Sequence, residues 1–137
     1  MREILFKAKR KNWRELPKEE WWVEGLPSYG INGEISEIEH WKDFANCEVV
    51  EIDPETLCQY TGLKDKDGNR IWENDIVEAW SEGQKAIGKV ERRIDGLYIM
   101  YPAYQKKFWG LRPDDLGETT VNIIGNIFDN PELLERI

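Results

Sequence analysis

The sequence has few of the residues that build metal centres and disulfide frameworks. Its 137 residues include two cysteines, Cys47 and Cys58, and one histidine, His40. A structural zinc site takes four ligands, and these three residues supply three at most. The cysteines form no CxxC pair, so we expect both to be reduced thiols that pack as small apolar groups. The sequence therefore predicts neither a metal site nor a cofactor.

Long apolar runs are also missing. No stretch approaches the roughly 20 apolar residues that a transmembrane helix needs. The opening, MREILFKAKRKNW, has neither the apolar core nor the small-residue cleavage site of a secretory signal. We therefore expect a cytoplasmic protein that makes no contact with a membrane.

Negative charge dominates, which disfavours nucleic-acid binding. The 27 Asp and Glu exceed the 19 Lys and Arg, and the formal net charge of −8 repels phosphate backbones. Basic residues nevertheless form two clusters along the sequence: Lys7, Lys9, Arg10, Lys11 and Arg14, then Lys85, Lys89, Arg92 and Arg93. They are either scattered solvated side chains or one basic face. A nucleic-acid-binding accessory protein therefore remains the alternative function.

Most of the chain alternates apolar and polar residues, which is the pattern of half-buried strands. The run LYIMY at 97–101 is apolar on both faces and predicts a central strand. Residues 87–94 are expected to form a strand that pairs with 97–103 through a turn at Asp95-Gly96. About five strands between residues 57 and 128 are the number that a small SH3-like barrel uses.

Helical signals are short. Asp53-Pro54 and Asn130-Pro131 each place a capping residue before a proline. The first predicts a single turn through Leu57, and residues 27–46 predict a long excursion with a helical or hairpin piece. We therefore expect a mainly β protein made of an N-terminal β-rich extension (1–52), an SH3-like barrel (53–129) and a short C-terminal helix (130–137).

The stretch DKDGNR, which starts at Asp65, fits either a calcium loop or a turn. Asp65, Asp67 and Asn69 alternate as the first ligands of a calcium loop do. Such a loop also needs glycine at position 6 and glutamate at position 12, where this chain has Arg70 and Ile76. We therefore expect a hairpin turn whose glycine takes positive φ.

Two long motifs stand out, DPETLCQYTGLKDKDGNRIWENDIV at 53–77 and IIGNIFDNPELL at 123–134. Together with the opening REILFKAKR…NWRE…WWVEG, they resemble the YopX-like family of phage and prophage proteins. Asn74 stands where that family usually has glycine, and asparagine tolerates left-handed backbone better than other non-glycine residues. The resemblance implies an SH3-like barrel carried by phage or prophage in bacteria. It implies no established activity and no catalytic residues.

Aromatic side chains are the candidate binding surface. SH3-like barrels bind peptides or nucleic acids across aromatic-rich grooves. The candidates from the predicted barrel are Trp72, Trp80, Tyr98, Tyr101, Tyr104 and Trp109. Each ring either packs in the core or joins an exposed groove. The sequence thus favours an accessory protein that binds a phage or host protein, alone or as a homo-oligomer.

Enzymatic activity is not expected. Asp114, Asp115 and Glu118 lie close together, and paired carboxylates can share a proton or hold a metal ion. These aspartates follow a proline, however, as turn residues often do. The single histidine, His40, leaves little general-base chemistry and is expected to be solvated.

Overall fold

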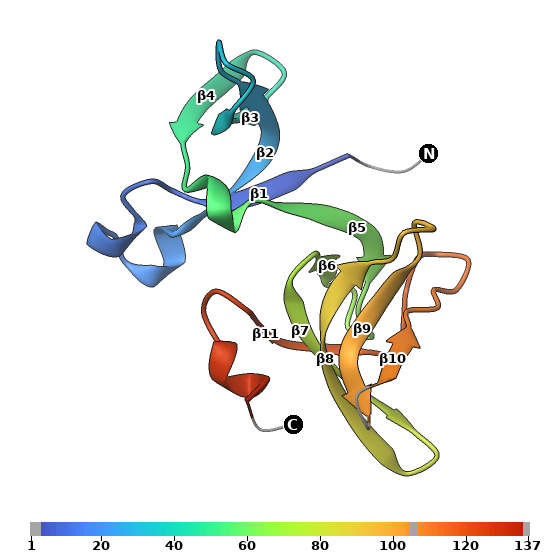
Figure 1. Ribbon diagram of the computed structural model, residues 1–137. Coiled ribbons are helices and arrows are strands. Elements are labelled where there is room, and N and C mark those ends of the chain that lie inside the picture. Colours follow the sequence, from blue (N-terminus) through green and yellow to red (C-terminus); the bar gives the residue numbers. More distant parts are fainter. Residues whose placement is uncertain (1–3, 105–106, 136–137) are drawn as a thin grey trace. The chain divides into compact units, whose positions relative to one another are not determined.

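The structure, a computed structural model, describes residues 4–104 and 107–135, with the backbone alone at positions 103 and 104. The described residues form strands and short 3-10 helices, so the mainly β fold is confirmed (Figure 1). None of the described helices has the length and apolar character to cross a membrane. The chain divides into two compact units, the first ending at Gln59 and the second beginning at Tyr60.

The first unit is an antiparallel sheet. Its strands, in the order β4-β3-β2-β1-β5, are β1 (Phe6–Lys9), β2 (Trp22–Tyr29), β3 (Ile35–Asp43), β4 (Asn46–Glu51) and the start of β5 (Cys58–Lys64). Its 3-10 helices are η1 (Trp13–Glu15), η2 (Lys18–Glu20) and η3 (Pro54–Thr56). The predicted turn at Pro54 is confirmed, because the Asp53 carboxylate accepts the Glu55 N–H at 3.2 Å. The core consists of Ala8, Val23, Ile38, Val50 and Ile52.

Residues 27–46 form regular strands rather than an excursion. They belong to β2, β3 and the start of β4, so of the two alternatives the hairpin is present and the helix is not. Gly25 permits a close approach between β2 and β3, since a Cβ there would lie 2.1 Å from the Glu39 carbonyl oxygen. His40 lies on β3, where its Nδ1 is 2.8 Å from the Glu24 carbonyl oxygen. The expectation of a loose segment around His40 is therefore wrong, whereas the half-buried ring still reaches solvent.

At the C-terminal end of β4, the chain pairs with the residues that follow β1. Arg10, just after β1, forms an antiparallel bridge with Ile52, just after β4. The Lys11 N–H also donates to the Glu51 carbonyl at 3.0 Å. The chain then turns into η1, so this pairing stops after two residues. The part of β4 that precedes Glu51 has β3 as its one neighbouring strand among the described residues.

The second unit contains a five-stranded antiparallel sheet in the order β10-β9-β8-β7-β11. Its strands are β7 (Asp75–Ser81), β8 (Gln84–Arg92), β9 (Tyr98–Tyr104), β10 (Lys107–Gly110) and β11 (Asn122–Asn126). The remainder of β5 pairs with β6 (Arg70–Trp72). The predicted pairing of 87–94 with 97–103 is confirmed by the β8–β9 ladder. The SH3-like barrel is not confirmed, because the described strands form open sheets and close no barrel.

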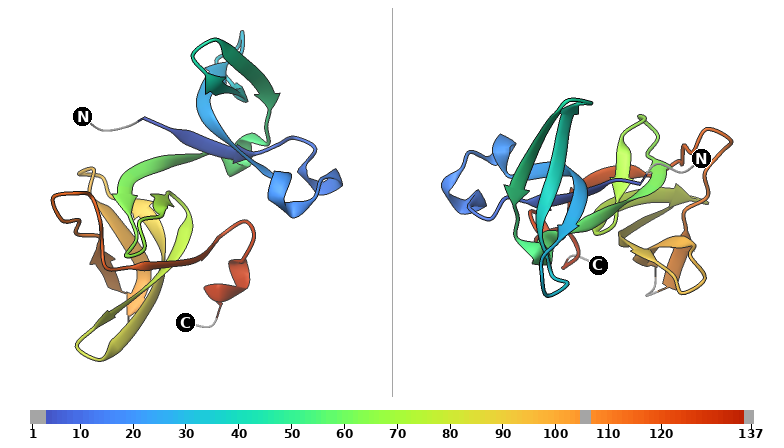
Figure 2. Two further views of the ribbon diagram at one scale, coloured as in Figure 1. Left: turned by 180° about the vertical axis from the view of Figure 1, so that it is seen from behind. Right: turned by 90° about the horizontal axis from the view of Figure 1, so that it is seen from above.

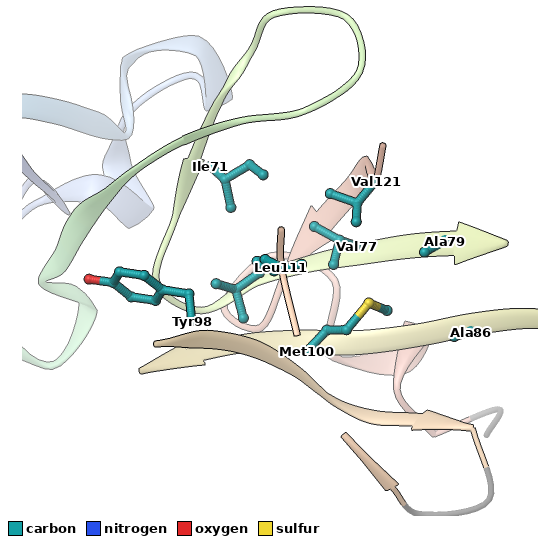
Figure 3. Packing of buried hydrophobic residues seen from close by; sticks show 9 residues of the cluster. Ile71, Val77, Ala79, Ala86, Tyr98, Met100, Leu111 and Val121 are labelled. Carbon is teal, nitrogen blue, oxygen red and sulfur yellow. The ribbon is translucent and has the colours of Figure 1, made fainter. Parts of the chain in front are cut away.

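Aliphatic side chains fill the second unit. Figure 3 shows Val77, Met100, Leu111 and Val121 pointing toward one another from different segments of the chain. The cluster also contains Ile71, Ala79, Ala86, Val90 and Tyr98. Gly88 lies on the same sheet face, where a Cβ would come within 2.7 Å of the Tyr101 backbone nitrogen. A glycine is therefore needed where β8 and β9 approach each other.

The expected C-terminal helix is a single 3-10 turn, η4 (Pro131–Leu133). Asn130 makes no side-chain cap to it. Its Oδ1 instead accepts the Asn126 N–H at the end of β11, at 3.3 Å. A short segment without a cap lacks the hydrogen bonds that would offset helix nucleation, so the turn ends after one step.

The predicted turn after β5 is confirmed. Asp65 is 1% exposed, and its Oδ1 accepts the N–H groups of Asp67 at 2.9 Å and Asn69 at 2.8 Å. Gly68 has a φ of +85°, which glycine adopts without steric cost. Asn74 also has positive φ, +72°, so it adopts the left-handed conformation that asparagine tolerates.

Candidate functional site

The six candidate aromatic residues occupy three different environments. Trp72 and Tyr98 are each 5% exposed and belong to the interior, so they offer no ring to a partner. Trp109 is half-buried against the core of the second unit. Trp80 and Tyr101 are 66% and 42% exposed. The side chain of Tyr104 lies outside the described part of the structure.

The strand register separates Trp80 and Tyr101 from Trp109. Trp109 pairs with Met100, whose side chain faces the core. Successive residues of a strand point to opposite faces. Tyr101, next to Met100, and Trp80, next to the core residue Ala79, therefore point away from the core. Trp80 pairs with Lys85 whereas Tyr101 pairs with Lys89, so these two rings also stand apart along the sheet.

A cavity of about 220 Å³ opens where the core of the second unit reaches the surface. Buried side chains of Met100, Leu111 and Val121 contribute to its wall, together with Trp109. Its other lining residues are Ala79, Trp80, Ser81, Gly110, Arg112, Thr119 and Thr120. The cavity thus joins segments at residues 79–81, 109–112 and 119–121. Trp80 and Trp109 both line it, although the Trp80 side chain is directed away from the core.

Four of the eleven lining residues, Ser81, Arg112, Thr119 and Thr120, have polar side chains, and Thr119 is already engaged in the fold. Thr119 Oγ1 donates to the Lys64 carbonyl at 2.9 Å and accepts the Val121 N–H at 3.4 Å. Arg112 is the one ionisable side chain among the described lining residues. An acid–base pair needs a second titratable group within hydrogen-bonding reach. The described lining therefore suits the binding of an apolar group more than proton transfer.

Asp114, one of the carboxylates considered for catalysis, has a structural role, and so has Asp75. Asp114 Oδ1 accepts the N–H groups of Leu116 at 2.8 Å and Glu118 at 3.0 Å, as Asp65 does in its own turn. Asp75 is 4% exposed, and its Oδ2 accepts the Trp72 N–H at 2.8 Å. Within residues 4–104 and 107–135, no group of three or more His, Cys, Asp or Glu side chains is placed to hold a metal ion.

The two basic clusters make many contacts within the fold. Arg10 Nε donates to the Glu20 carbonyl at 3.0 Å. The ion pairs are Lys11–Glu51 at 3.4 Å, Lys85–Glu78 at 3.3 Å, Lys89–Glu91 at 2.9 Å and Arg93–Asp95. Such pairs neutralise the positive charge that a phosphate backbone would require.

A cation–aromatic cluster in the first unit escaped the sequence analysis. Lys9 is 2% exposed, although the sequence placed it in a basic cluster. Its Nζ lies 3.8 Å from the ring centroid of Trp13, 4.5 Å from that of Trp21 and 5.7 Å from that of Trp22. Cation–π attraction is strongest for such desolvated cations over indole. No local spacing predicts the cluster, because its members come from β1, η1, the residue after η2 and the start of β2.

Comparisons with known proteins agree with this description. No curated protein matches the sequence. The crystal structure of protein EF1440 from Enterococcus faecalis superposes with a TM-score of 0.52 at 22% identity, covering 98% of this chain and 99% of that one. At this identity the likeness concerns the fold alone. The sequence model of the YopX protein family matches residues 12–135. Because that match spans nearly the whole chain, this protein belongs to the YopX family.

Proposed function

We propose that this chain is a non-catalytic protein-binding module that takes up an apolar side chain of its partner in the cavity of the second unit. The proposal rests on the volume of the cavity and on the residues that line it. At about 220 Å³ it lies below the roughly 300–1,000 Å³ typical of small-molecule sites. Its wall combines the apolar side chains of Met100, Leu111 and Val121 with the polar ones of Ser81, Arg112, Thr119 and Thr120. A space of this kind matches one anchoring side chain of a protein partner.

The absence of enzymatic activity is part of the same proposal. The carboxylates of Asp65, Asp75 and Asp114 accept backbone N–H groups in turns, which supports structural roles for them. Arg112 at the cavity supplies a positive charge for a carboxylate or carbonyl of the partner, but no general base.

The biological setting follows from the family resemblance. We infer a phage or prophage accessory protein that acts in the bacterial cytoplasm on a phage or host protein, or on a second copy of itself. Nucleic-acid binding is the weaker alternative, because the net charge is −8 and several basic side chains are already paired.

The test is capture of partners from a lysate of the lysogenic or infected host, with and without nuclease, read by mass spectrometry. Thr120 is exposed and lines the cavity, so Thr120→Glu places a charge at its mouth, whereas Thr120→Val keeps the size of the side chain. We expect a discrete protein that survives nuclease, is retained by T120V and is lost with T120E. A partner that T120E retains, or that nuclease removes, contradicts the proposal.

A methyl spectrum gives a direct readout of the site. The chain has two methionines, and Met100 lines the cavity. The captured partner should therefore shift the ¹³C-methyl signal of Met100 when it is added to the purified protein. An unchanged Met100 signal at saturation would place the partner elsewhere on the protein.

A further inference from the structure

The first unit offers a second binding feature, the unpaired edge of β4. Figures 1 and 2 show β4 at the outer side of this unit's sheet, with β3 beside it. Five of its six residues are exposed, and Val50 is the buried one. A trough of about 660 Å³ runs along this edge. Its lining residues are Arg10, Lys11, Asn12 and Glu15 on one side and Glu48, Val49, Val50 and Glu51 on the other.

The direction of each backbone group of β4 follows from two hydrogen bonds. The Ile52 N–H donates to Ser36, on the β3 side, at 3.0 Å. The Glu51 carbonyl instead accepts the Lys11 N–H on the trough side, also at 3.0 Å. Because backbone groups alternate along a strand, the N–H and C=O of Val49 and of Cys47 also point to the trough. Glu39 and Trp41 are therefore the non-hydrogen-bonded partners of Val49 and Cys47, and no hydrogen bond from outside the β3–β4 ladder reaches these four groups within the described residues.

On the trough side, β4 therefore has a neighbouring chain segment among the described residues at its C-terminal end only. Arg10 and Lys11 form this segment opposite Ile52 and Glu51, and the chain then turns into η1. Sheet edges with unpaired groups are the surface on which extended peptides add as a further strand. An incoming segment would lie beside β4 next to Lys11 and would form backbone hydrogen bonds with Val49 and Cys47.

The side chains around this edge indicate the chemistry of such a segment. On one face, Val49 is 56% exposed, next to Trp41 at 52% on β3. Acidic residues around this apolar strip are Glu37, Glu39, Glu48 and Glu51. Glu48 pairs with Lys42 and Glu51 pairs with Lys11, each at 3.4 Å, but both are exposed surface pairs, which contribute little to stability. With Glu15 in the trough, five described carboxylates stand against the three cations Arg10, Lys11 and Lys42, so the edge keeps a net negative charge. The complementary strand thus carries apolar residues opposite Val49 and Cys47 and a lysine or arginine opposite Glu48.

A second copy of β4 fits this edge poorly. In a symmetric antiparallel pair centred on residue 48, Glu48 would face its own equivalent, and like charges directly opposite destabilise a sheet. A pair centred on Val49 would bring Cys47 of the copy to Glu51, whose carbonyl Lys11 already uses. A pair centred on Cys47 would match only Asn46–Glu48 within the strand.

We propose that the trough-side edge of β4 binds an extended, basic segment of a partner protein, which adds to the sheet as a strand. This site lies in the first unit and is independent of the cavity proposed above. The backbone groups of Val49 and Cys47 provide the hydrogen bonds, and the carboxylates around them select positive charge.

The experiment uses the full chain and synthetic peptides. The probe is acetyl-Lys-Val-Lys-Val-Lys-Val-amide, and acetyl-Glu-Val-Glu-Val-Glu-Val-amide is its acidic counterpart. At saturation, the basic peptide should slow hydrogen exchange at the Val49 and Cys47 amides by about tenfold or more, with little change at Glu48. The acidic peptide should bind about tenfold more weakly or worse.

Two matched pairs test the backbone contact. N-methylation of the peptide's valines blocks the N–H groups that face β4, whereas N-methylation of its lysines blocks those on the far side. In the protein, Val49→Pro removes an N–H that the fold does not use, which edge strands tolerate, and Val49→Thr retains it. We expect valine methylation and V49P each to weaken binding about tenfold or more, and V49T to change it less than about twofold.

Several results would overturn the proposal. These are an absence of binding, equal binding of the acidic peptide, or unchanged exchange at Val49 and Cys47 when the wild-type protein is saturated. The last readout needs no variant, so it holds even if V49P fails to fold. Protection of these amides that grows with protein concentration in the absence of peptide would assign the edge to a second copy instead.

Discussion

The second unit buries nine described residues in one largely aliphatic cluster, whereas the first unit buries five and adds a lysine enclosed by tryptophans. In the second unit, stability grows with the apolar area removed from water. In the first unit, the small apolar core is supplemented by the attraction between the Lys9 ammonium and the Trp13 and Trp21 rings. Two units of one chain thus reach a folded state with different balances of the same forces.

The largest effect is expected from the interior of the second unit. Trp72 is 5% exposed and packs on Tyr60 with ring centroids 5.6 Å apart. Trp72→Ala should lower the free energy of unfolding by about 3–5 kcal/mol, because it leaves a cavity. Trp80→Ala, at a ring that is 66% exposed, should change it by less than about 0.5 kcal/mol. Urea denaturation of both variants measures the contrast, and similar losses would show that Trp72 does not differ from a surface residue.

A smaller effect is expected from the turn that Asp65 forms. Asp65→Ala removes the acceptor of the Asp67 and Asn69 N–H groups and should cost about 1–3 kcal/mol. Asp114→Ala makes the same change in an exposed turn, where water replaces the carboxylate, and should cost less. Thermal unfolding with and without calcium should give the same Tm for wild type and for Asp65→Ala. A calcium-dependent rise in wild type alone would contradict the assignment of a turn.

The comparison between the units is tested most directly at Lys9. Lys9→Met keeps an apolar stem but removes the ammonium from the indoles, so we expect a loss of about 1–2 kcal/mol. Lys11→Met is the matched control, because Lys11 is exposed and forms an ion pair at the surface. Its effect should be below about 0.5 kcal/mol and should vanish in high salt. A Lys9→Met variant as stable as wild type would mean that the tryptophans stabilise the unit by apolar contact alone.

The smallest effect concerns thiol reactivity in the first unit. Cys47 is exposed, whereas Cys58 is buried and its Sγ lies 3.3 Å from the Thr56 carbonyl oxygen. Desolvation, followed by the nearby Glu39 carboxylate, raises the pKa of the Cys47 thiol. A maleimide should therefore label one thiol of the native protein, with a rate that rises at higher pH than for an ordinary cysteine. Glu39→Gln should shift that pH profile to lower pH, because it removes the carboxylate that raises the pKa of Cys47. Rapid labelling of both cysteines would contradict the burial of Cys58.

Local patterns predicted much of the backbone. The run LYIMY, apolar on both faces, identified β9, and the Asp-Gly dipeptides identified the turns at Gly68 and Gly96, because both signals depend on a few consecutive residues. The C-terminal helix was predicted too long, because the Asn130 side chain binds β11, a contact that the local sequence does not encode.

The sites were harder to predict than the strands. Aromatic content indicated candidates but not faces, since exposure depends on the register of each strand with its neighbours. Trp72 and Tyr98 therefore became core residues, while Trp80 remained exposed. Lys9 was counted as surface charge because its burial depends on tryptophans 4 to 13 positions later in the chain.

The acidic residues of β4 have one more consequence, for solubility. An exposed strand edge is a template on which copies of a protein aggregate, and charged side chains on the edge are a common safeguard. Glu48 and Glu51 occupy this place on β4, and repulsion between copies keeps their edges apart. Glu48→Gln together with Glu51→Gln removes that safeguard. The same strand that is open to a basic segment is therefore the one from which precipitation of such a variant should start.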